Sequence, residues 1–304
     1  MDNRKPAAAD LALIRSFHQE RIEHTYTRKD AILYALGVGL GADPTDAIDL
    51  AYLYEEGLRV LPGFGGVLAY PGMWIKDQPQ LGMDWKTVLN GEQGITLHRP
   101  IPPEGEVTGT LRVDRVVDKG RGKDLLVYTV REIRDRPTGE LICTITNTVV
   151  CRKQGVQDAP PPAAGGAAAA TVVPQRPPDH VYSQPILPQA GLLYRLSGDL
   201  NALHVDPKVA AAAGFPRPIL QGAATWGMVA YGLMKVLCRG RDAGFRSYSA
   251  RFTAPVYPGE VLNTDIWVVA PGEAVFRTST GDARRVVLDA GRFAYSPGEE
   301  SYAQ

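Results

Sequence analysis

The sequence predicts an α+β protein built from two similar units, each with a helical part followed by an antiparallel sheet. Three observations favour this class. Segments with strand-like apolar patterns are separated by turn residues, helical patterns precede each group of strands, and a segment rich in Pro, Ala and Gly divides the chain. The chain has 304 residues, which is enough for two domains of ordinary size. Because helices and strands follow in the same order twice, we interpret the chain as a duplicated α+β unit.

The composition is that of an ordinary globular protein, with 44% hydrophobic and 22% charged residues. The 33 basic and 33 acidic residues balance. No overall field therefore attracts nucleic acid or an anionic membrane, and we expect neither as a partner. The first residues lack the continuous apolar core of a signal peptide, and no apolar run reaches the length of a membrane span. We therefore expect a cytoplasmic protein.

The cysteines and histidines limit the chemistry further. The three cysteines are odd in number and match no Cys-x-x-Cys motif, which favours a reducing, intracellular compartment. None of the five histidines is spaced as a pair of metal ligands, so we expect no metal site.

The pattern divides the chain into four parts. Residues 1–20 are an amphipathic N-terminal extension, and residues 21–153 form the first unit. Residues 154–178 are a linker, because Pro and Gly oppose regular structure there and the Ala run has no large apolar group to bury. Residues 179–304 form the second unit.

The helical part of the first unit has one clear helix and one interrupted segment. Thr27 and Asp30 resemble a capping box, and apolar residues follow them at helical spacing. Residues 44–56 suggest a second short helix. Residues 61–74 are apolar but contain four Gly and two Pro, so a long regular helix is not expected in this segment.

Strands follow from Gly94 onward, and turn signals at residues 102–105, 119–122 and 136–139 predict an antiparallel meander. The second unit repeats the plan. Its predicted elements are helices at residues 188–196 and 219–237, then strands at residues 247–254, 261–269, 274–280 and 284–295.

The long helix at residues 219–237 contains many small residues. A Gly in a helix interior costs about 1 kcal/mol relative to Ala. Gly222, Gly227 and Gly232 are therefore expected where another element approaches closely, as a sheet wrapped around the helix would. Ordinary tight packing is the alternative explanation.

The segment before this helix has the highest density of proton-transfer groups. Asp199 and His204 are five residues apart, which on an α-helix would separate them by about 140°. Gly198 and Asn201 favour a turn, which can bring the two side chains together. A carboxylate and an imidazole that share one water can take its proton and return one to a substrate. A pair that only stabilises the turn is equally compatible with the composition.

Gly222 begins the long helix, and the first amides of a helix are unpaired donors at the positive end of its dipole. An amide at that position could stabilise a developing oxyanion, and a Gly would let a substrate come close.

Six stretches together resemble the MaoC-like (R)-specific enoyl-CoA hydratase 2 family, including the hydratase 2 unit of peroxisomal multifunctional enzyme type 2. They are HTYTRKDAILYALGVG, NGEQGITLHRPIPPEG, VVDKGRGK, YRLSGDLNALHVDP, AGFPRPILQG and ARFTAPVYPGE. The similarity runs from about His24 to Tyr295, which is nearly the whole chain.

The resemblance implies a double-hotdog fold, with two antiparallel sheets each wrapped around a helix. It implies reversible hydration of a trans-2-enoyl-CoA to an (R)-3-hydroxyacyl-CoA, with an acyl-CoA as substrate, no metal or redox cofactor, and a homodimer. By analogy Asp199 and His204 are the catalytic pair, Asn201 positions substrate or water, and Gly222 faces the thioester oxygen.

This chain departs from the family pattern at two positions. Ala202 stands where a Pro is common, which should loosen the loop slightly. Gln221 stands where a His is common at the head of the long helix, and Gln cannot titrate at neutral pH.

The first unit lacks the Asp-x-Asn-x-x-His pattern, and its helix is expected to be shortened or irregular over residues 61–74. We therefore expect the first unit to house a bulky or long acyl chain. Basic side chains are candidates for the CoA phosphates, although solvent-exposed turn charges are the alternative; they are Arg251, Lys119, Arg121 and Lys123.

Other functions remain open at this point. The substrate could be a branched, dicarboxylic or aromatic acyl-CoA, or the protein could bind acyl-CoA without catalysis. A thioesterase is less favoured, because it would not need this Asp-Asn-His loop.

Overall fold

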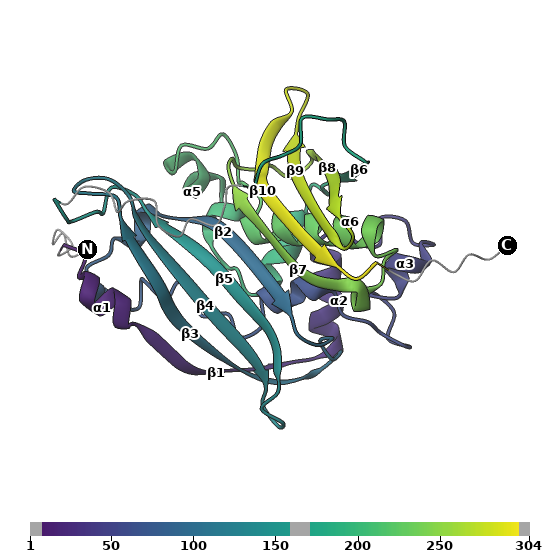
Figure 1. Cartoon of the computed structure of the whole chain (residues 1–304), viewed down its shortest axis with the longest axis horizontal. Coiled ribbons are helices and arrows are strands. Elements are labelled where there is room, and N and C mark those ends of the chain that lie inside the picture. Colours follow the sequence, from purple (N-terminus) through teal and green to yellow (C-terminus); the bar gives the residue numbers. More distant parts are fainter. Residues whose placement is uncertain (1–7, 159–170, 298–304) are drawn as a thin grey trace.

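The computed structural model describes residues 8–158 and 171–297 and forms one continuous antiparallel sheet of ten strands (Figure 1). The strand order is β1-β3-β4-β5-β2-β7-β10-β9-β8-β6. Five strands come from each half of the chain, and the halves meet where β2 pairs with β7. The predicted α+β double-hotdog fold is confirmed, with its two sheets joined edge to edge.

The first half contains three α-helices and three 3-10 helices among its described residues. They are α1 (Leu11–Ser16), α2 (Arg28–Gly37), α3 (Ala47–Leu50), η1 (Pro62–Gly66), η2 (Pro79–Leu81) and η3 (Trp85–Thr87). Its strands are β1 (His18–Tyr26), β2 (Val88–Leu97), β3 (Gly105–Asp118), β4 (Leu125–Asp135) and β5 (Leu141–Cys151).

The second half has one long helix. Its helices are α4 (Ala190–Tyr194), η4 (Arg195–Ser197), η5 (Ala202–His204), α5 (Pro207–Ala212), α6 (Gly222–Leu237) and η6 (Asp242–Gly244). Its strands are β6 (His180–Pro185), β7 (Phe245–Phe252), β8 (Val261–Ala270), β9 (Glu273–Thr280) and β10 (Arg285–Tyr295).

The helix expected after Thr27 is present as α2 and begins with the predicted capping box. The Thr27 amide donates to the Asp30 carboxylate at 2.8 Å, and the Thr27 hydroxyl donates to the same oxygen at 2.7 Å. The helix expected over residues 44–56 is only one turn long, because α3 spans Ala47–Leu50.

Residues 11–16 and 18–20 of the expected N-terminal extension form regular structure. Asp10 caps α1 by accepting from two backbone amides, and Leu11 and Ile14 are buried against the sheet of the first half. Strand β1 then begins at His18 and crosses the boundary expected at residue 20. Residues 1–7 lie outside the described part of the chain.

Only the two ends of the expected linker are described. At its start, the amides of Val156 and Gln157 each donate to the Asp118 carboxylate at 2.9 Å. At its end, Arg176 forms an ion pair with Asp179. Residues 159–170 of the expected linker lie outside the described residues.

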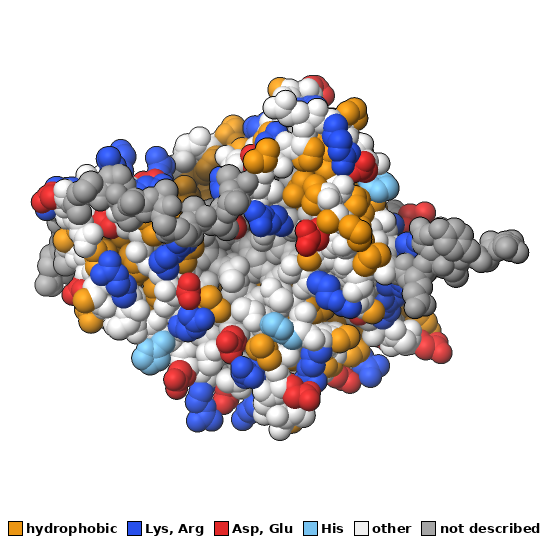
Figure 2. Space-filling model, viewed as in Figure 1, with side chains coloured by type: hydrophobic (Ala, Val, Ile, Leu, Met, Phe, Trp, Pro, Cys, Tyr) orange, Lys and Arg blue, Asp and Glu red, His pale blue; other side chains and the backbone are white. Residues whose placement is uncertain are grey.

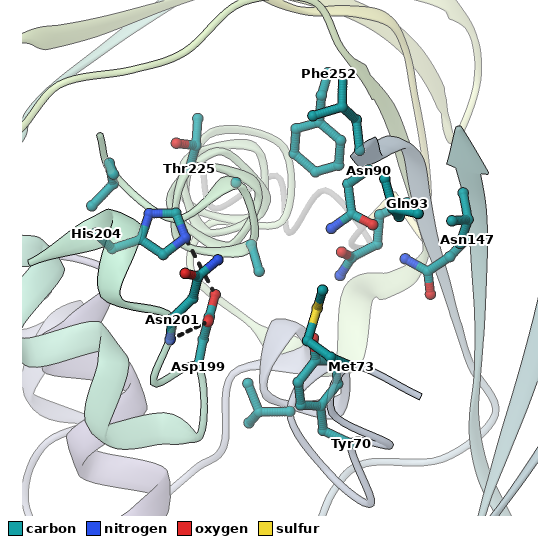
Figure 3. Close-up of a pocket in the computed structure, with 18 of the residues that line it drawn as sticks. Tyr70, Met73, Asn90, Gln93, Asn147, Asp199, Asn201, His204, Thr225 and Phe252 are labelled. Atoms are coloured by element: carbon teal, nitrogen blue, oxygen red, sulfur yellow. Dashed lines mark hydrogen bonds and ion pairs between the residues drawn. The ribbon is translucent and has the colours of Figure 1, made fainter. Parts of the chain in front are cut away.

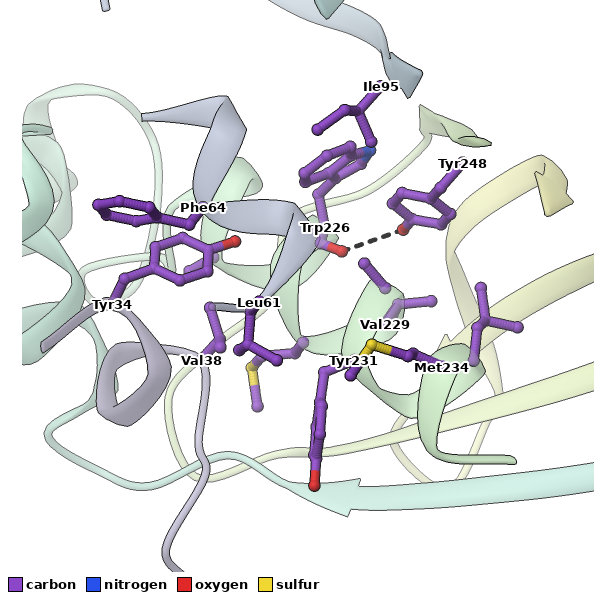
Figure 4. Packing of buried hydrophobic residues seen from close by; sticks show 14 of the residues in the cluster. Tyr34, Val38, Leu61, Phe64, Ile95, Trp226, Val229, Tyr231, Met234 and Tyr248 are labelled. Carbon is purple, nitrogen blue, oxygen red and sulfur yellow. Dashed lines mark hydrogen bonds between the residues drawn. The ribbon is translucent and has the colours of Figure 1, made fainter. Parts of the chain in front are cut away.

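Helix α6 lies inside the sheet of the second half, and every residue of 224–234 is buried. Trp226 on α6 links the two halves by hydrogen bonds (Figure 4). Its indole N–H donates to the Gln93 carbonyl on β2 at 3.1 Å, and its own carbonyl accepts from the Tyr248 hydroxyl on β7 at 3.1 Å. The apolar core is therefore shared between the halves.

The first half has no equivalent of α6 among its described residues. Its segment 61–74 forms the five-residue helix η1 and then irregular chain, as the Gly and Pro content predicted. The predicted shortening of the N-terminal helix is confirmed.

The small residues of α6 mark close approaches, as expected. A side chain at Gly232 would overlap the Tyr182 ring on β6. At Gly227, a Cβ atom would lie 2.6 Å from the Tyr34 hydroxyl and 2.8 Å from a Val38 methyl group, both in or next to α2.

Charged side chains of both signs are mixed on the surface. Basic and acidic side chains are interspersed over the face shown in Figure 2. Within residues 8–158 and 171–297, no helix combines the length and apolar content that a membrane span requires. The three cysteines are buried and unpaired.

We predict that Gly227→Ala lowers the free energy of unfolding by about 1–3 kcal/mol, because overpacking outweighs the gain in helix propensity. The Tyr34 hydroxyl is buried without a hydrogen-bond partner, so Tyr34→Phe alone should be neutral or stabilising. The double variant should recover part of the loss. Chemical denaturation of the four proteins measures this cycle, and a Gly227→Ala protein more stable than the wild type would contradict the close contact.

Candidate active site

A cavity of about 500 Å³ lies between the two halves. One wall comes from the segment after η1 and from the inner faces of β2, β4 and β5. The other wall comes from the loop that carries Asp199, from the head of α6 and from β7. The cavity therefore occupies the space that the missing long helix leaves in the first half.

The loop between α4 and α5 brings three of the expected residues to the cavity wall. Gly198 takes φ +114°, a conformation that L side chains rarely adopt, and so permits the turn. Asp199, Asn201 and His204 then all line the cavity (Figure 3). Asp206 caps α5 by accepting from the Lys208 amide at 2.8 Å, which fixes the far end of the loop.

Asp199 and His204 face each other across a short gap. The Asp199 Oδ2 atom lies 3.7 Å from the His204 Nε2 atom, too far for a direct hydrogen bond. The exposed fractions of the two side chains are 30% and 9%. The other Asp199 oxygen accepts from the Asn201 amide at 3.2 Å, which fixes the direction of the carboxylate.

The tautomer of His204 follows from its second contact. Its Nδ1 atom lies 2.9 Å from the Ile219 carbonyl oxygen, which can only accept a hydrogen bond. Nδ1 must therefore carry the proton, and in the neutral ring Nε2 is left as an acceptor toward Asp199. Two acceptors 3.7 Å apart are suited to share one donor molecule such as water.

Asn201 is oriented by its own loop. Its side-chain oxygen caps η5 by accepting from the Leu203 amide at 3.1 Å. The side-chain NH₂ group remains as a donor at the cavity wall. Ala202 begins η5 directly, so the loop forms its 3-10 turn without the Pro that is common in the family.

The head of α6 supplies unpaired donors. Gly222 and Ala223 line the cavity, and their backbone amides have no acceptor among the described residues. A Cβ atom at Gly222 would lie 3.3 Å from the Phe252 ring, so a side chain there would crowd the cavity. Two N–H groups at the positive end of a 16-residue helix form a suitable site for a developing negative charge.

The Gln221 side chain contacts the protein interior and not the cavity. It is fully buried, and its NH₂ group donates to the Gly191 carbonyl at 3.1 Å. This bond holds α4 against the head of α6.

The structure does not bring the four basic candidates to the cavity. Side-chain alternation along β7 directs Phe252 inward and Arg251 to the opposite, exposed face, where it lies in register with Glu92 and Asp289. Lys119, Arg121 and Lys123 belong to the turn between β3 and β4, and none of them lines the cavity. Arg121 forms an exposed ion pair with Asp158. A role for these residues in CoA binding stays a prediction.

Sequence reasoning missed the polar residues of the opposite wall. They are Asn90, Gln93, Thr129, Arg131 and Asn147. The alternation of buried positions along the strands could have located them. In β4, for example, every second residue from Leu125 to Ile133 is buried, and Thr129 and Arg131 occupy two of these inward positions.

Comparison with known proteins places this geometry in a family. The profile described as the MFE-2 hydratase 2 N-terminal domain matches residues 24–153, and the profile described as the MaoC like domain matches residues 169–290. The chain belongs to the MaoC-like enoyl-CoA hydratase 2 family of enzymes. The predicted family and the prediction of an enzyme are confirmed.

Two relatives and one solved structure illustrate the similarity. The 3-hydroxyacyl-thioester dehydratase Y of Mycobacterium tuberculosis is 39% identical, over 90% of this chain and 94% of the relative. The peroxisomal enoyl-CoA hydratase 2 of Arabidopsis thaliana is 32% identical, over 92% and 93%. The crystal structure of a MaoC-like dehydratase from Phytophthora capsici is 28% identical with a TM-score of 0.81, covering 95% of this chain and 98% of that one.

Proposed function

We propose that this protein catalyses the reversible addition of water to a trans-2-enoyl-CoA, which gives an (R)-3-hydroxyacyl-CoA. The observation that carries the proposal is the meeting of Asp199 and His204 on the same cavity wall as the unpaired amides of α6. The names of the relatives, an enoyl-CoA hydratase and a hydroxyacyl-thioester dehydratase, describe the two directions of this reaction.

The reaction needs a base for water, a proton for C2 and a donor for the thioester oxygen. One water donates its two hydrogens to the Asp199 carboxylate and the neutral His204 Nε2 atom. As its oxygen bonds to C3, one proton passes to this pair, and a proton returns from the pair to C2. The product gains one hydroxyl group and one hydrogen, and the pair ends in its starting state.

The thioester oxygen gains negative charge when C3 is attacked. In our proposal the amides of Gly222 and Ala223 donate to that oxygen, and the dipole of α6 adds to their effect. The Asn201 NH₂ group holds the water or the substrate. Because the water and the thioester oxygen are held by different fixed groups, water reaches one face of the double bond; the (R) configuration follows the family resemblance.

The acyl chain extends into the first half of the cavity. Apolar residues line much of that part, among them Trp74, Leu111, Ile145 and Val149. The proposed reaction uses no metal or redox cofactor. Within the described residues, no three His, Cys, Asp or Glu side chains are grouped as a metal site. The homodimer and the cytoplasmic location stay predictions, and sedimentation measurements would check the dimer.

We predict that Asp199→Asn and His204→Gln each lower kcat by about 100-fold or more, because each removes one of the two acceptors that activate water. Loss of the conjugated-thioester absorbance of crotonyl-CoA measures the rate, and chiral chromatography gives the product configuration. Activity should persist in the presence of a metal chelator.

Asp206→Asn is the matched control, since Asn caps a helix as well as Asp and this position faces α5. Its rate should equal that of the wild type. Full activity in either catalytic-loop variant, or an (S) product, would contradict the mechanism. Binding without hydration would favour a silent acyl-CoA-binding protein, and release of free thiol would indicate a thioesterase.

We also predict that Val149→Phe lowers kcat/KM for long enoyl-CoA substrates by about tenfold or more and leaves crotonyl-CoA nearly unaffected. Val149 is buried and lines the first half of the cavity. Val150→Phe is the control, because the neighbouring position of β5 does not line the cavity. Equal loss for short and long substrates would show that the acyl chain takes another path.

A further inference from the structure

The wall opposite Asp199 and His204 carries a row of polar side chains on three neighbouring strands. Thr129 on β4 lies directly across from Asn147 on β5, and Asn147 lies across from Gln93 on β2. All three residues line the cavity. Figure 3 shows Gln93 and Asn147 on the far side of the cavity from His204.

A β-bulge adds a fourth member to this wall. Asn90 and Gln93 are three residues apart, so strict alternation would place their side chains on opposite faces of β2. The pairing of β2 with β5 shifts register between Asn90 and Glu92, and both Asn90 and Gln93 line the cavity. Bulges commonly re-aim a side chain in this way near functional sites.

Three of these side chains end in amides that have no hydrogen-bond partner in the described part of the chain. Among the described residues, no hydrogen bond is formed by the side chains of Asn90, Gln93 or Asn147; Gln93 is only 5% exposed, Asn147 is half-buried and Asn90 is exposed. Polar groups inside a protein are normally hydrogen-bonded. Two buried hydroxyls of the second half, those of Thr264 and Thr278, pair with each other at 2.9 Å in this way. The unpaired amides of Gln93 and Asn147 at the cavity wall therefore point to a polar ligand group.

Arg131 indicates which kind of polar ligand group this wall would bind. It lines the cavity, is 4% exposed and forms no ion pair with a carboxylate among the described residues. Burial lowers the pKa of Arg131 to about 10, so it is still protonated at neutral pH. Its positive charge favours an electron-rich oxygen in the cavity.

Two of the five N–H donors of the Arg131 guanidinium are bonded to the chain. Its two terminal nitrogens donate to the carbonyls of Ala69 at 3.2 Å and Gly66 at 2.6 Å, which holds the segment after η1 in place. Its Nε–H group is buried without a partner among the described residues, so a donor remains for an oxygen of a ligand. Side-chain amides both donate and accept, so they match a neutral hydroxyl or keto oxygen.

We propose that the first half of the cavity binds an acyl chain that carries a neutral oxygen function, a hydroxyl or keto group, beyond the reacting carbons. Asn90, Gln93 and Asn147 are the residues that determine this specificity. The inference rests on the proposed function, since it names the class of acyl-CoA that the enzyme accepts.

Calorimetry with saturated acyl-CoA thioesters tests this specificity independently of hydration, because these compounds lack the reacting double bond. One ligand is unsubstituted, and the others have the same length with one hydroxyl at successive carbons. We expect at least one hydroxylated ligand to bind about tenfold more tightly than the unsubstituted one, as one or two net hydrogen bonds provide.

Asn147→Leu and Gln93→Met replace the amides with apolar groups of similar size. Each should lower the preference to about twofold or less and leave the affinity for the unsubstituted ligand equal or higher. Thr146→Val on the exposed face of the same strand is the control and should keep the full preference. Thermal melting establishes that each variant is folded, and either variant alone suffices for the comparison.

Equal affinity of the wild type for all ligands would overturn the proposal. The amides would then bind water and not the acyl chain. A preference that survives in both variants would overturn the assignment of residues. Tighter binding of a dicarboxylic acyl-CoA than of every hydroxylated one would overturn the choice of a neutral oxygen. A separate hydration assay with crotonyl-CoA tests the proposed function, so the two ideas fail independently.

Discussion

One long helix serves a sheet that runs through both halves of the chain. Helix α6 fills the inside of the second half, whereas the first half offers only the five-residue η1 and irregular chain. The space that remains is the cavity. Trp226 joins the halves beside it, since its indole N–H donates to the Gln93 carbonyl of the first half and its carbonyl accepts from the Tyr248 hydroxyl of the second. Because a protein interior is otherwise close-packed, this asymmetry decides where a substrate can enter.

The proposed catalytic pair depends on the same helix. The segment that leads into α6 supplies the Ile219 carbonyl that fixes the His204 tautomer, and Gln221 holds α4 against the helix head. The unpaired amides at the start of α6 belong to the same few residues. One element thus orients the base and presents the donors, so a shift of α6 would disturb both together.

Much of this arrangement could be predicted from the sequence, and the misses have physical causes. The capping box of Thr27, the irregular segment 61–74 and the small residues of α6 each express a local rule, and each prediction is confirmed. Strands β1 and β6 were not predicted, and they are the two edges of the sheet. Edge strands are half solvated, so their sequences lack the apolar alternation that identifies a strand.

The site shows the same division between local and long-range information. The loop around Asp199 can be recognised in the sequence, because its proton-transfer residues and turn formers lie within a few positions of one another. The wall opposite is assembled from Thr129, Asn147 and Gln93, which are far apart in sequence and meet only through strand register. The bulge after Asn90 had one local signal, the Gly at position 91 inside the strand, but its effect on the side chains depends on how β2 pairs with β5.

This contrast suggests how chemistry and specificity are separated in the molecule. The groups proposed to activate water sit on one loop and one helix end, both in the second half. The groups proposed to select the acyl chain sit on the inner face of the first half, where the described residues form no long helix over them. Substitutions on that face can alter the cavity without moving the Ile219–His204 contact, because the two sets of residues share no hydrogen bond among the described residues. Substrate range can therefore change while the catalytic loop stays the same.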